Sequence, residues 1–297
     1  MTASLTPPGA QPIWDGVLVR FGEIGIKSSS VRARMVSRLR SNLMDQMLRR
    51  KTEGDVEVRG SRLWMRGADT DALLDAAVHT FGVVSASPVR RVAPTMEALV
   101  AAAPPLALSR PWTRFAIRAR REGNQEFSSQ DVGIQAGSAV FRAAEAAGRK
   151  PKVDLKSPEF ELHIDVRQDA AYIFLDGAEG PGGIPTATQG KVVCTLRDRN
   201  DALAAWFMLR RGCSVAPAGN VDPALLSHLR GWGLSKPIGS DVPEAAMTWK
   251  AMAIASGETL DQPVAPPVAG GMPVLRPLYG LDPEERARWM LRSGLGG

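Results

Sequence analysis

The sequence predicts a mixed α/β protein of three units, in which an α+β N-terminal half is followed by a reduced Rossmann-like α/β domain. Its 297 residues suit two or three compact domains of ordinary size. Strand-like and helix-like segments alternate along the first half, and a segment rich in glycine and proline then separates the halves. We expect a disordered tail, two domains, a linker and a third domain, with boundaries at 1–13, 14–93, 94–180, 181–190 and 191–297.

The first unit shows the order strand, helix, strand, strand, helix, strand. A short apolar strand at Val17–Arg20 is followed, over residues 28–50, by apolar residues at steps of four, which places them on one helix face. The remaining elements are a hairpin turned at Gly60-Ser61, a helix over Asp71–Phe81 that ends at Gly82, and an extended segment over Val83–Val92. This order is typical of a ferredoxin-like domain.

The second unit combines two helices with several strands. Met96–Ala107 has the composition of a helix, and we expect Pro104-Pro105 to interrupt it. An alternating strand at Thr113–Ala119 and an alanine-rich helix over Gln130–Ala147 follow. The unit ends in a hairpin made by Phe160–Val166 and Ala170–Phe174.

Positive charge is concentrated in two segments of these units. The formal net charge of the chain is +6. Residues 14–50 carry eight Lys or Arg against three Asp or Glu, and residues 110–156 carry ten against five. Two basic islands in separate segments indicate a polyanionic partner, although solvated helix faces would give the same counts.

Other features of the composition exclude several classes of protein. No apolar run approaches the roughly 20 residues that a membrane helix needs, and residues 1–13 lack the apolar core of a signal peptide. The two cysteines and three histidines show no metal-binding spacing, so we expect no metal site. We therefore expect a cytoplasmic protein without membrane association.

The most informative segment is a strand-turn-helix over residues 190–209. Val192–Leu196 is strand-like, and an apolar helical run starts at Ala202. Such a turn normally offers backbone N–H groups and a helix N-terminus to a phosphate, and it needs glycine so that the backbone can approach the anion. Here the turn, Arg197-Asp-Arg-Asn-Asp201, carries two carboxylates and no glycine. The pattern therefore keeps the scaffold of an ATP site and lacks its phosphate-binding chemistry.

Several blocks of sequence occur in an order that is also found in a known family. The first is Leu18–Ser28, with Gly-Glu and a lysine at its end. Three more, Phe115–Gly123, Phe127–Ser129 and Val153–Pro158, resemble the signature of a THUMP domain, an RNA-binding module. The later blocks, Gly182–Pro185, Ala253–Leu260 and Pro273–Leu278, are similar to the linker and nucleotide-side segments of a PP-loop domain. Over residues 17–285 the chain resembles the tRNA 4-thiouridine synthetase (ThiI) family, which implies a ferredoxin-like domain, a THUMP domain and a PP-loop-type domain.

The chain also departs from this family. The family's PP-loop reads Ser-Gly-Gly-x-Asp-Ser and holds ATP while a uridine oxygen is adenylated, and only Asp201 matches in the stretch aligned with it. We expect Asp201, Ser256 and Gly257 to be the vestige of a nucleotide site, with no catalytic residue and no cofactor. The family's catalytic cysteine would lie beyond the end of this sequence. Cys194 and Cys213 match no catalytic position, so we expect both to be buried structural thiols.

We therefore interpret the chain as an RNA-binding, ThiI-like protein whose adenylation domain is a scaffold. The expected partner is tRNA or another structured RNA, read by shape because few aromatic residues lie near the basic ones. One alternative is a divergent ATP-dependent tRNA sulfurtransferase, which would use ATP and Mg²⁺, and another is a homodimer or the RNA-binding subunit of a separate catalytic protein. The residues expected to contact phosphates are Lys27, Arg32, Arg34, Arg118, Arg120, Arg121, Lys150, Lys152 and Lys156.

Overall fold

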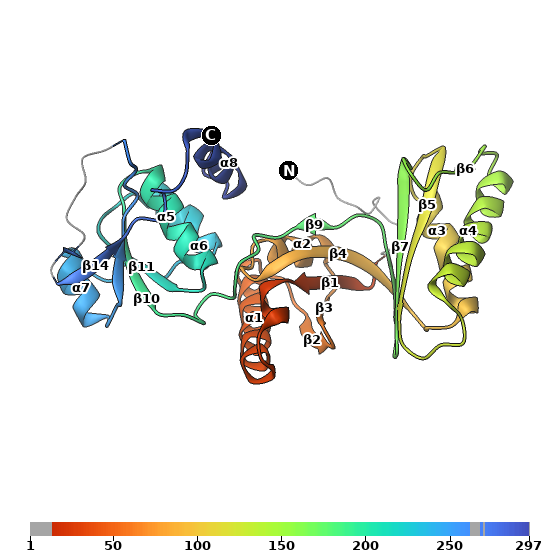
Figure 1. Cartoon of the computed structure of the whole chain (residues 1–297), viewed down its shortest axis with the longest axis horizontal. Helices are drawn as coiled ribbons and strands as arrows, with labels where there is room; N and C mark the ends of the chain where they lie inside the picture. Colours follow the sequence, from red (N-terminus) through yellow and green to blue (C-terminus); the bar gives the residue numbers. More distant parts are fainter. Residues whose placement is uncertain (1–13, 262–267, 270, 297) are drawn as a thin grey trace.

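The computed structural model describes residues 14–261, 268–269 and 271–296. Figure 1 shows three units in a row, with the N-terminal domain between the other two. The expected tail, residues 1–13, lies outside the described residues. Within the described part of the chain, no helix is long and apolar enough to cross a membrane.

The N-terminal domain has the ferredoxin-like arrangement that the sequence predicts. Its elements are β1 (Gly16–Phe21), the short 3-10 helix η1 (Glu23–Ile26), α1 (Ser29–Arg49), β2 (Asp55–Arg59), β3 (Arg62–Arg66), α2 (Thr70–Val78) and β4 (Val83–Val92). The strand order is β2-β3-β1-β4, and each pair is antiparallel. The four-residue spacing has its expected effect, because α1 buries Met35, Leu39, Leu43 and Met47 in the core of this domain.

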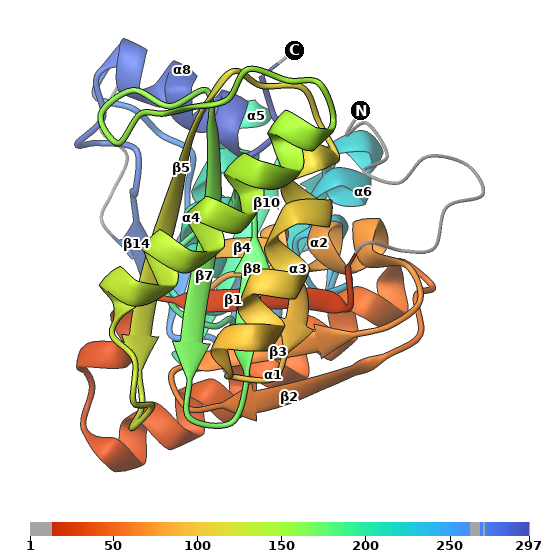
Figure 2. The ribbon, with the colours of Figure 1, turned by 90° about the vertical axis from the view of Figure 1, so that its right-hand side faces the viewer.

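Strand β4 belongs to the sheets of both the first and the second domain. Its first part pairs with β1, and its last residues, Arg90–Val92, pair with β8. The second domain contains α3 (Met96–Leu108), β5 (Arg114–Glu122), α4 (Ser129–Ala146), β6 (Lys152–Val153), β7 (Phe160–Arg167) and β8 (Ala171–Phe174). After β8 the chain returns to the N-terminal domain, where β9 (Ala178–Glu179) pairs with the first part of β4. The order β4-β8-β7-β5-β6 makes one continuous sheet across both domains. Figure 2 shows α3 and α4 side by side over the second part of that sheet.

The two prolines in α3 do not interrupt the helix, so that expectation was wrong. Pro104 and Pro105 lie inside a helix that continues to Leu108. Each proline removes one backbone hydrogen bond. The helix continues because Leu99 and Ala103 before the prolines, and Leu106 after them, are buried in the same core. Tertiary packing outweighs the local preference here.

The third domain is a mostly parallel sheet with helices on both faces. Its elements are β10 (Lys191–Leu196), α5 (Arg199–Arg210), β11 (Ser214–Val221), α6 (Pro223–Gly231), α7 (Val242–Thr248), β12 (Ala253–Ala255), β13 (Val268–Ala269), β14 (Met272–Leu275) and α8 (Pro283–Arg292). The order is β11-β10-β12-β14-β13, with only β13 antiparallel to its neighbour. The strand order reverses between β10 and β12, and α/β folds bind ligands at the carboxyl ends of strands at such a point.

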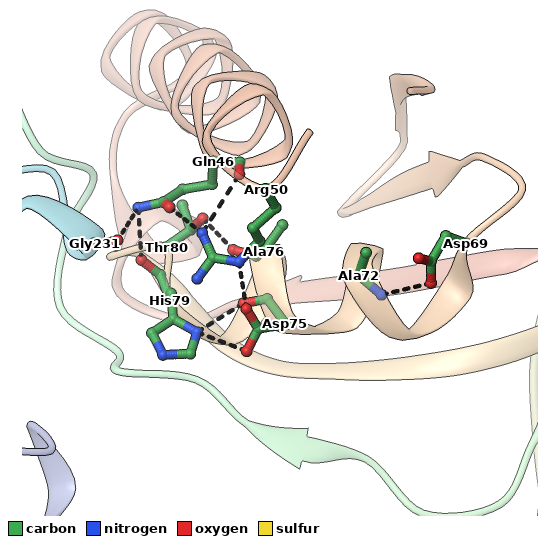
Figure 3. Close-up of polar contacts among 9 residues, drawn as sticks. All are labelled: Gln46, Arg50, Asp69, Ala72, Asp75, Ala76, His79, Thr80 and Gly231. Carbon is green, nitrogen blue, oxygen red and sulfur yellow. Dashed lines mark hydrogen bonds and ion pairs between the residues drawn. The ribbon is translucent and has the colours of Figure 1, made fainter. Parts of the chain in front are cut away.

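The N-terminal and third domains are joined through a buried contact. Phe81 is 1% exposed and belongs to the core of the third domain, with its ring centroid 5.2 Å from that of Trp206 and 5.4 Å from that of Trp232. Beside it, Nε2 of Gln46 donates to the carbonyl oxygens of His79 and Gly231, at 3.1 Å each (Figure 3). One domain therefore completes the core of the other.

Candidate nucleic-acid interface

The second domain carries an open groove of about 1300 Å³. Residues of α4, β5 and β7 and of the segment 153–155 line it, and Arg20 of β1 and Arg62 of β3 line its end at the N-terminal domain. Figure 2 shows α4 lying across β5 and β7, which places the groove beside the helix. The groove is therefore built from both domains that share the continuous sheet.

One side of the groove is apolar and open to solvent. Ile134 of α4 is 58% exposed, and Val153 and Leu155, on the facing segment, are 53% and 61% exposed. Single exposed apolar residues are ordinary, but three around one groove mark a contact surface. Ile117 and Phe141 extend this surface inward.

Two arginines lie at the junction of the domains. Arg20 and Arg62 are directly opposite each other on the antiparallel strands β1 and β3, so their side chains share one face of the sheet. Burial, followed by repulsion from Arg62, lowers the pKa of Arg20 to about 10. Burial also lowers the pKa of Arg62. Both guanidinium groups remain charged at neutral pH.

Arg118 is tied into the wall of the groove. Its guanidinium donates to Oε1 of Glu161 at 2.6 and 2.9 Å and to the carbonyl oxygen of Leu155 at 2.9 Å. These bonds connect β5 to β7 and to the segment 153–155. Arg120 and Arg142 also line the groove, are exposed, and form no ion pair within the described part of the chain.

Aromatic side chains form part of the floor, which the sequence analysis did not anticipate. The rings of His163 and Phe174 are stacked, with centroids 5.1 Å apart and planes within 8°. The guanidinium carbon of Arg20 lies 4.5 Å from the centre of the Phe174 ring. Burial lowers the pKa of His163, although Glu161 opposes this effect. The floor therefore combines a cation with two stacked aromatic rings.

The strand-turn-helix of the third domain is organised around Asp201. This residue is 1% exposed, and its carboxylate accepts bonds from the backbone N–H of Arg197 at 3.1 Å, from Nε of Arg197 at 2.8 Å and from the N–H of Gly257 at 3.0 Å. Burial raises the pKa of Asp201, but these bonds and one from Thr195 outweigh burial and lower it overall. A charged carboxylate of the protein thus engages the backbone donors at the ends of β10 and β12.

Gly257 packs directly on the first turn of α5. A Cβ atom on Gly257 would lie 2.3 Å from the backbone N of Asp201 and 2.4 Å from the carbonyl carbon of Asn200. Asp198 caps the helix, because its Oδ1 accepts the N–H of Asp201 at 2.9 Å. The buried Ser256 connects this unit to β14 through its N–H, which donates to Leu275 at 2.9 Å. Asp201, Ser256 and Gly257 therefore lie together in one packed unit.

Of the two cysteines of the third domain, one lies in its core and the other, against expectation, is only half-buried beside that core. Cys194 on β10 is fully buried, and burial raises the pKa of its thiol well above the ordinary value. Cys213 is half-buried and packs against the same core, and burial raises its pKa as well. Neither thiol has the lowered pKa of a reactive cysteine.

Family models match the first two domains. A model described as the ThiI ferredoxin-like domain matches residues 16–87, and one described as the THUMP domain matches residues 93–176. A probable tRNA sulfurtransferase of Halobacterium salinarum is 40% identical over 72% of this chain and 54% of its own length. The chain is a THUMP-domain protein that resembles the ThiI family of tRNA sulfurtransferases.

Two further relatives of this THUMP-domain protein have the same kind of name. A probable tRNA sulfurtransferase of Methanosarcina acetivorans is 38% identical over 68% of this chain and 50% of the relative. A tRNA sulfurtransferase of Pyrobaculum aerophilum is 29% identical over 94% of this chain and 66% of the relative. The chain spans about half the length of the first two relatives.

Two solved structures share the fold over most of the chain. A Pyrococcus horikoshii protein superposes with a TM-score of 0.79 at 22% identity, covering 94% of this chain and 99% of its own. A 4-thiouridine synthetase, described in complex with RNA and with bound ATP, superposes with a TM-score of 0.75 at 20% identity, covering 95% and 86%. The predicted succession of ferredoxin-like, THUMP and Rossmann-like domains is therefore confirmed.

The structure places the nine expected phosphate contacts in three locations. Arg118 and Arg120 line the groove of the THUMP domain. Arg121, Lys150, Lys152 and Lys156 are exposed outside its lining. Lys27, Arg32 and Arg34 surround the start of α1, where Nη2 of Arg32 donates to the carbonyl oxygen of Lys27 at 3.1 Å.

Sequence reasoning missed Arg20, Arg62 and Phe174 in the groove. It searched for basic runs, whereas Arg20 and Arg62 are single charges at the ends of apolar strands. The available signal was the ferredoxin-like order itself. That order pairs the first strand with the third, and so brings the two arginines together.

Proposed function

We propose that this THUMP-domain protein binds tRNA along its groove, and that its third domain is a scaffold that does not adenylate RNA. The observation that carries the first part is the set of groove cations, Arg20, Arg62 and Arg120. None of them forms an ion pair in the part of the chain that the structure describes. Arginines without carboxylate partners beside an apolar wall suit phosphates with attached sugars and bases.

The groove offers each part of a nucleotide a chemically matched surface. Guanidinium groups bind phosphate oxygens in a fixed, two-pronged geometry. The stacked His163 and Phe174 offer a ring face to a base, and the apolar side around Ile134 and Leu155 suits ribose and base edges. Stacking of this kind needs unpaired nucleotides, so the groove favours a single-stranded part of a structured RNA. That the RNA is a tRNA rests on the names of the relatives.

The scaffold interpretation rests on how the ends of β10 and β12 are filled. A nucleotide site needs free backbone N–H groups converging on phosphate. Here Asp201 accepts the N–H groups of Arg197 and Gly257, and Asp198 accepts that of Asp201. The two carboxylates would also repel a triphosphate. The buried thiol of Cys194 is poorly suited to carry sulfur, because its raised pKa keeps it protonated.

The RNA proposal is tested by titrating labelled tRNA against salt. Phosphate contacts give a log–log slope of about −0.7 to −0.9 for each contact, so three groove arginines give about −2 or steeper. The variant Arg120→Ala should weaken binding and make the slope shallower by about one contact. Arg288→Ala is the matched control, because Arg288 is a 75% exposed arginine on α8 of the third domain. Binding that ignores salt, or equal behaviour of the two variants, contradicts the proposal.

The scaffold proposal is tested by calorimetry with Mg-ATP, with and without tRNA. We expect no binding at micromolar concentrations. The names of the relatives favour the alternative, a divergent tRNA sulfurtransferase. Micromolar ATP affinity, or pyrophosphate release that depends on tRNA, would establish that alternative. If tRNA binds and ATP does not, a separate protein that supplies the chemistry should co-purify with the chain on tRNA.

A further inference from the structure

The Arg20–Arg62 pair has a geometry that folding alone does not explain. The two residues are direct cross-strand neighbours, and like charges in that position repel and destabilise a sheet. Both are partly buried, which lowers the pKa of both guanidinium groups, and the positive charges of Arg120 and Arg167 lower it further. Two cations are thus held together in a position where their own interaction is unfavourable.

The donors of this pair are incompletely used. Nη1 of Arg20 donates to Oγ of Ser87 at 2.9 Å, and Nη1 of Arg62 donates to the carbonyl oxygen of Ser61 at 3.0 Å. Nη2 of Arg20 and Nε of Arg62 are buried and have no hydrogen-bond partner among the described residues. Buried donors on charged groups are costly when unpaired.

The nearby carboxylates are already engaged by another arginine. Asp165 lines the same part of the groove and is 6% exposed. Its two oxygens lie 2.9 Å from Nε and Nη2 of Arg167. Glu122 also pairs with Arg167. Asp165 raises the pKa of Arg20, but the combined effects of burial and the other guanidinium groups are larger. The local charge at Arg20 and Arg62 therefore remains positive.

We infer that Arg20 and Arg62 form a phosphate-binding subsite at the domain junction, which holds one phosphate group of the bound RNA. A phosphate there would accept from the unpaired donors and remove the repulsion between the two cations. The subsite belongs to strands of the ferredoxin-like domain, whereas the stacked Phe174 beside it belongs to the THUMP domain. One nucleotide would thus bridge both domains. This inference rests on the proposed function for the source of the phosphate.

The test compares Arg62→Met with Arg66→Met in the full chain. Arg66 lies on the same strand, is paired with Glu57 and Asp55, and does not line the groove. If Arg62 serves the ligand, its removal should leave the free protein at least as stable as wild type, since it relieves repulsion. It should also weaken tRNA binding about tenfold at fixed salt. A structural arginine would show the reverse, with lost stability and unchanged affinity of the folded protein.

Inorganic phosphate, at constant ionic strength, provides a second probe. It should raise the melting temperature of wild type and of Arg66→Met, but not of Arg62→Met. It should also compete with tRNA for wild type and not for Arg62→Met, which distinguishes an RNA phosphate from a separate small-anion site. Should Arg62→Met fail to fold, Arg20→Lys keeps the charge and removes the planar fork, and the same loss of affinity is expected.

The two proposals fail in different ways. If wild type binds tRNA and Arg62→Met binds it within threefold of Arg66→Met, the subsite is refuted and RNA binding stands. If wild type binds no tRNA, the proposed function is refuted and the phosphate measurement alone decides the subsite. In that case, the subsite is supported if phosphate raises the melting temperature of wild type and of Arg66→Met but not that of Arg62→Met. A wild type that phosphate does not stabilise refutes it.

Discussion

The packing of Gly257 on the first turn of α5 gives the sharpest test of the scaffold proposal. The perturbation is Gly257→Ala. The added Cβ would lie 2.3, 2.4 and 2.7 Å from three backbone atoms of Asn200 and Asp201, whereas ordinary contacts begin at 3.4 Å. Because these atoms are backbone, no side-chain rotation relieves the clash. The first turn of α5 must move by about 1 Å, from 2.3 to 3.4 Å at the closest atom.

Two contributions set the size of the effect. Forcing a methyl group into a packed site costs about 1–3 kcal/mol. The displacement also breaks the bond from Gly257 N–H to the Asp201 carboxylate, now 3.0 Å, which costs about 1–3 kcal/mol because the carboxylate is buried. We expect the free energy of unfolding of the third domain to fall by about 2–6 kcal/mol. The melting temperature should fall by at least about 8 °C, because 1 kcal/mol shifts the midpoint of a domain of about 100 residues by about 4–8 °C.

The assay is thermal and urea unfolding followed by tryptophan fluorescence, because Trp206 lies in the core of the third domain. Gly280→Ala is the control, since nothing lies within 4 Å of a Cβ on Gly280. A midpoint for Gly257→Ala within about 1 °C of the control would refute the packing argument. Under the scaffold proposal, Mg-ATP leaves the midpoints of wild type and variant unchanged, and the folded variant keeps its affinity for tRNA. ATP-dependent stabilisation of wild type would refute the scaffold proposal itself.

Three further predictions concern the domain joint and the groove. The hydrogen bond from His79, with that from Arg50, outweighs burial and lowers the pKa of Asp75 to about 2. Asp75 therefore stabilises the fold fully above its unfolded pKa of about 4, and this stabilisation is lost as the pH falls from about 4 to about 2. Because Asp75 is half-exposed, we expect a modest effect: in urea, the free energy of unfolding of Asp75→Asn should be about 1 kcal/mol below that of wild type at pH 7. The difference should be smaller at pH 3, and an equal difference at both pH values would contradict this prediction. In calorimetry, Phe81→Ala should lower the free energy of unfolding by about 3–5 kcal/mol, because Phe81 is buried in the core of the third domain. Val84→Ala, at an exposed neighbouring position, should lower it little, and equal losses in the two variants would show that Phe81 contributes nothing to that core. Arg118→Ala should weaken tRNA binding more than Arg120→Ala, because it leaves the carboxylate of Glu161 without its arginine partner beside the groove. The double variant Arg118→Ala with Glu161→Ala should recover part of the lost affinity, and no recovery would exclude this explanation.

Local patterns were sufficient to predict most of the fold. The steps of four in α1 and the alternation in β10, where Val192 and Cys194 face α5 while Val193 faces α7, follow directly from helix and strand periods. The prolines of α3 are the exception, because the burial that keeps this helix continuous depends on tertiary contacts that the sequence does not display.

The groove could not be predicted in the same way. Its subsite depends on the pairing of Arg20 with Arg62, and its wall on the bond between Arg118 and Glu161, which join residues distant in sequence. Counting charges instead selects exposed residues such as Lys152 and Lys156, whose clustering is visible along the chain. The contact of Asp201 with Gly257 was expected only through a family resemblance, since no period relates the two positions.

The joint between domains gives a physical reason for a third domain that is proposed to have no adenylation chemistry. Phe81 ends the segment that leads into β4, the strand on which both the ferredoxin-like sheet and the THUMP sheet depend. Its ring is covered by Trp206 and Trp232, and Gln46 reaches the backbone of Gly231. Without the third domain, an apolar ring and a buried amide would face water at the base of that strand. Because Arg20 and Phe174 belong to different domains and meet only through the continuous sheet, a less well fixed β4 would loosen the groove. Under the proposed function, the third domain supports RNA binding by holding β4 in place, and this role requires its core and not its nucleotide chemistry.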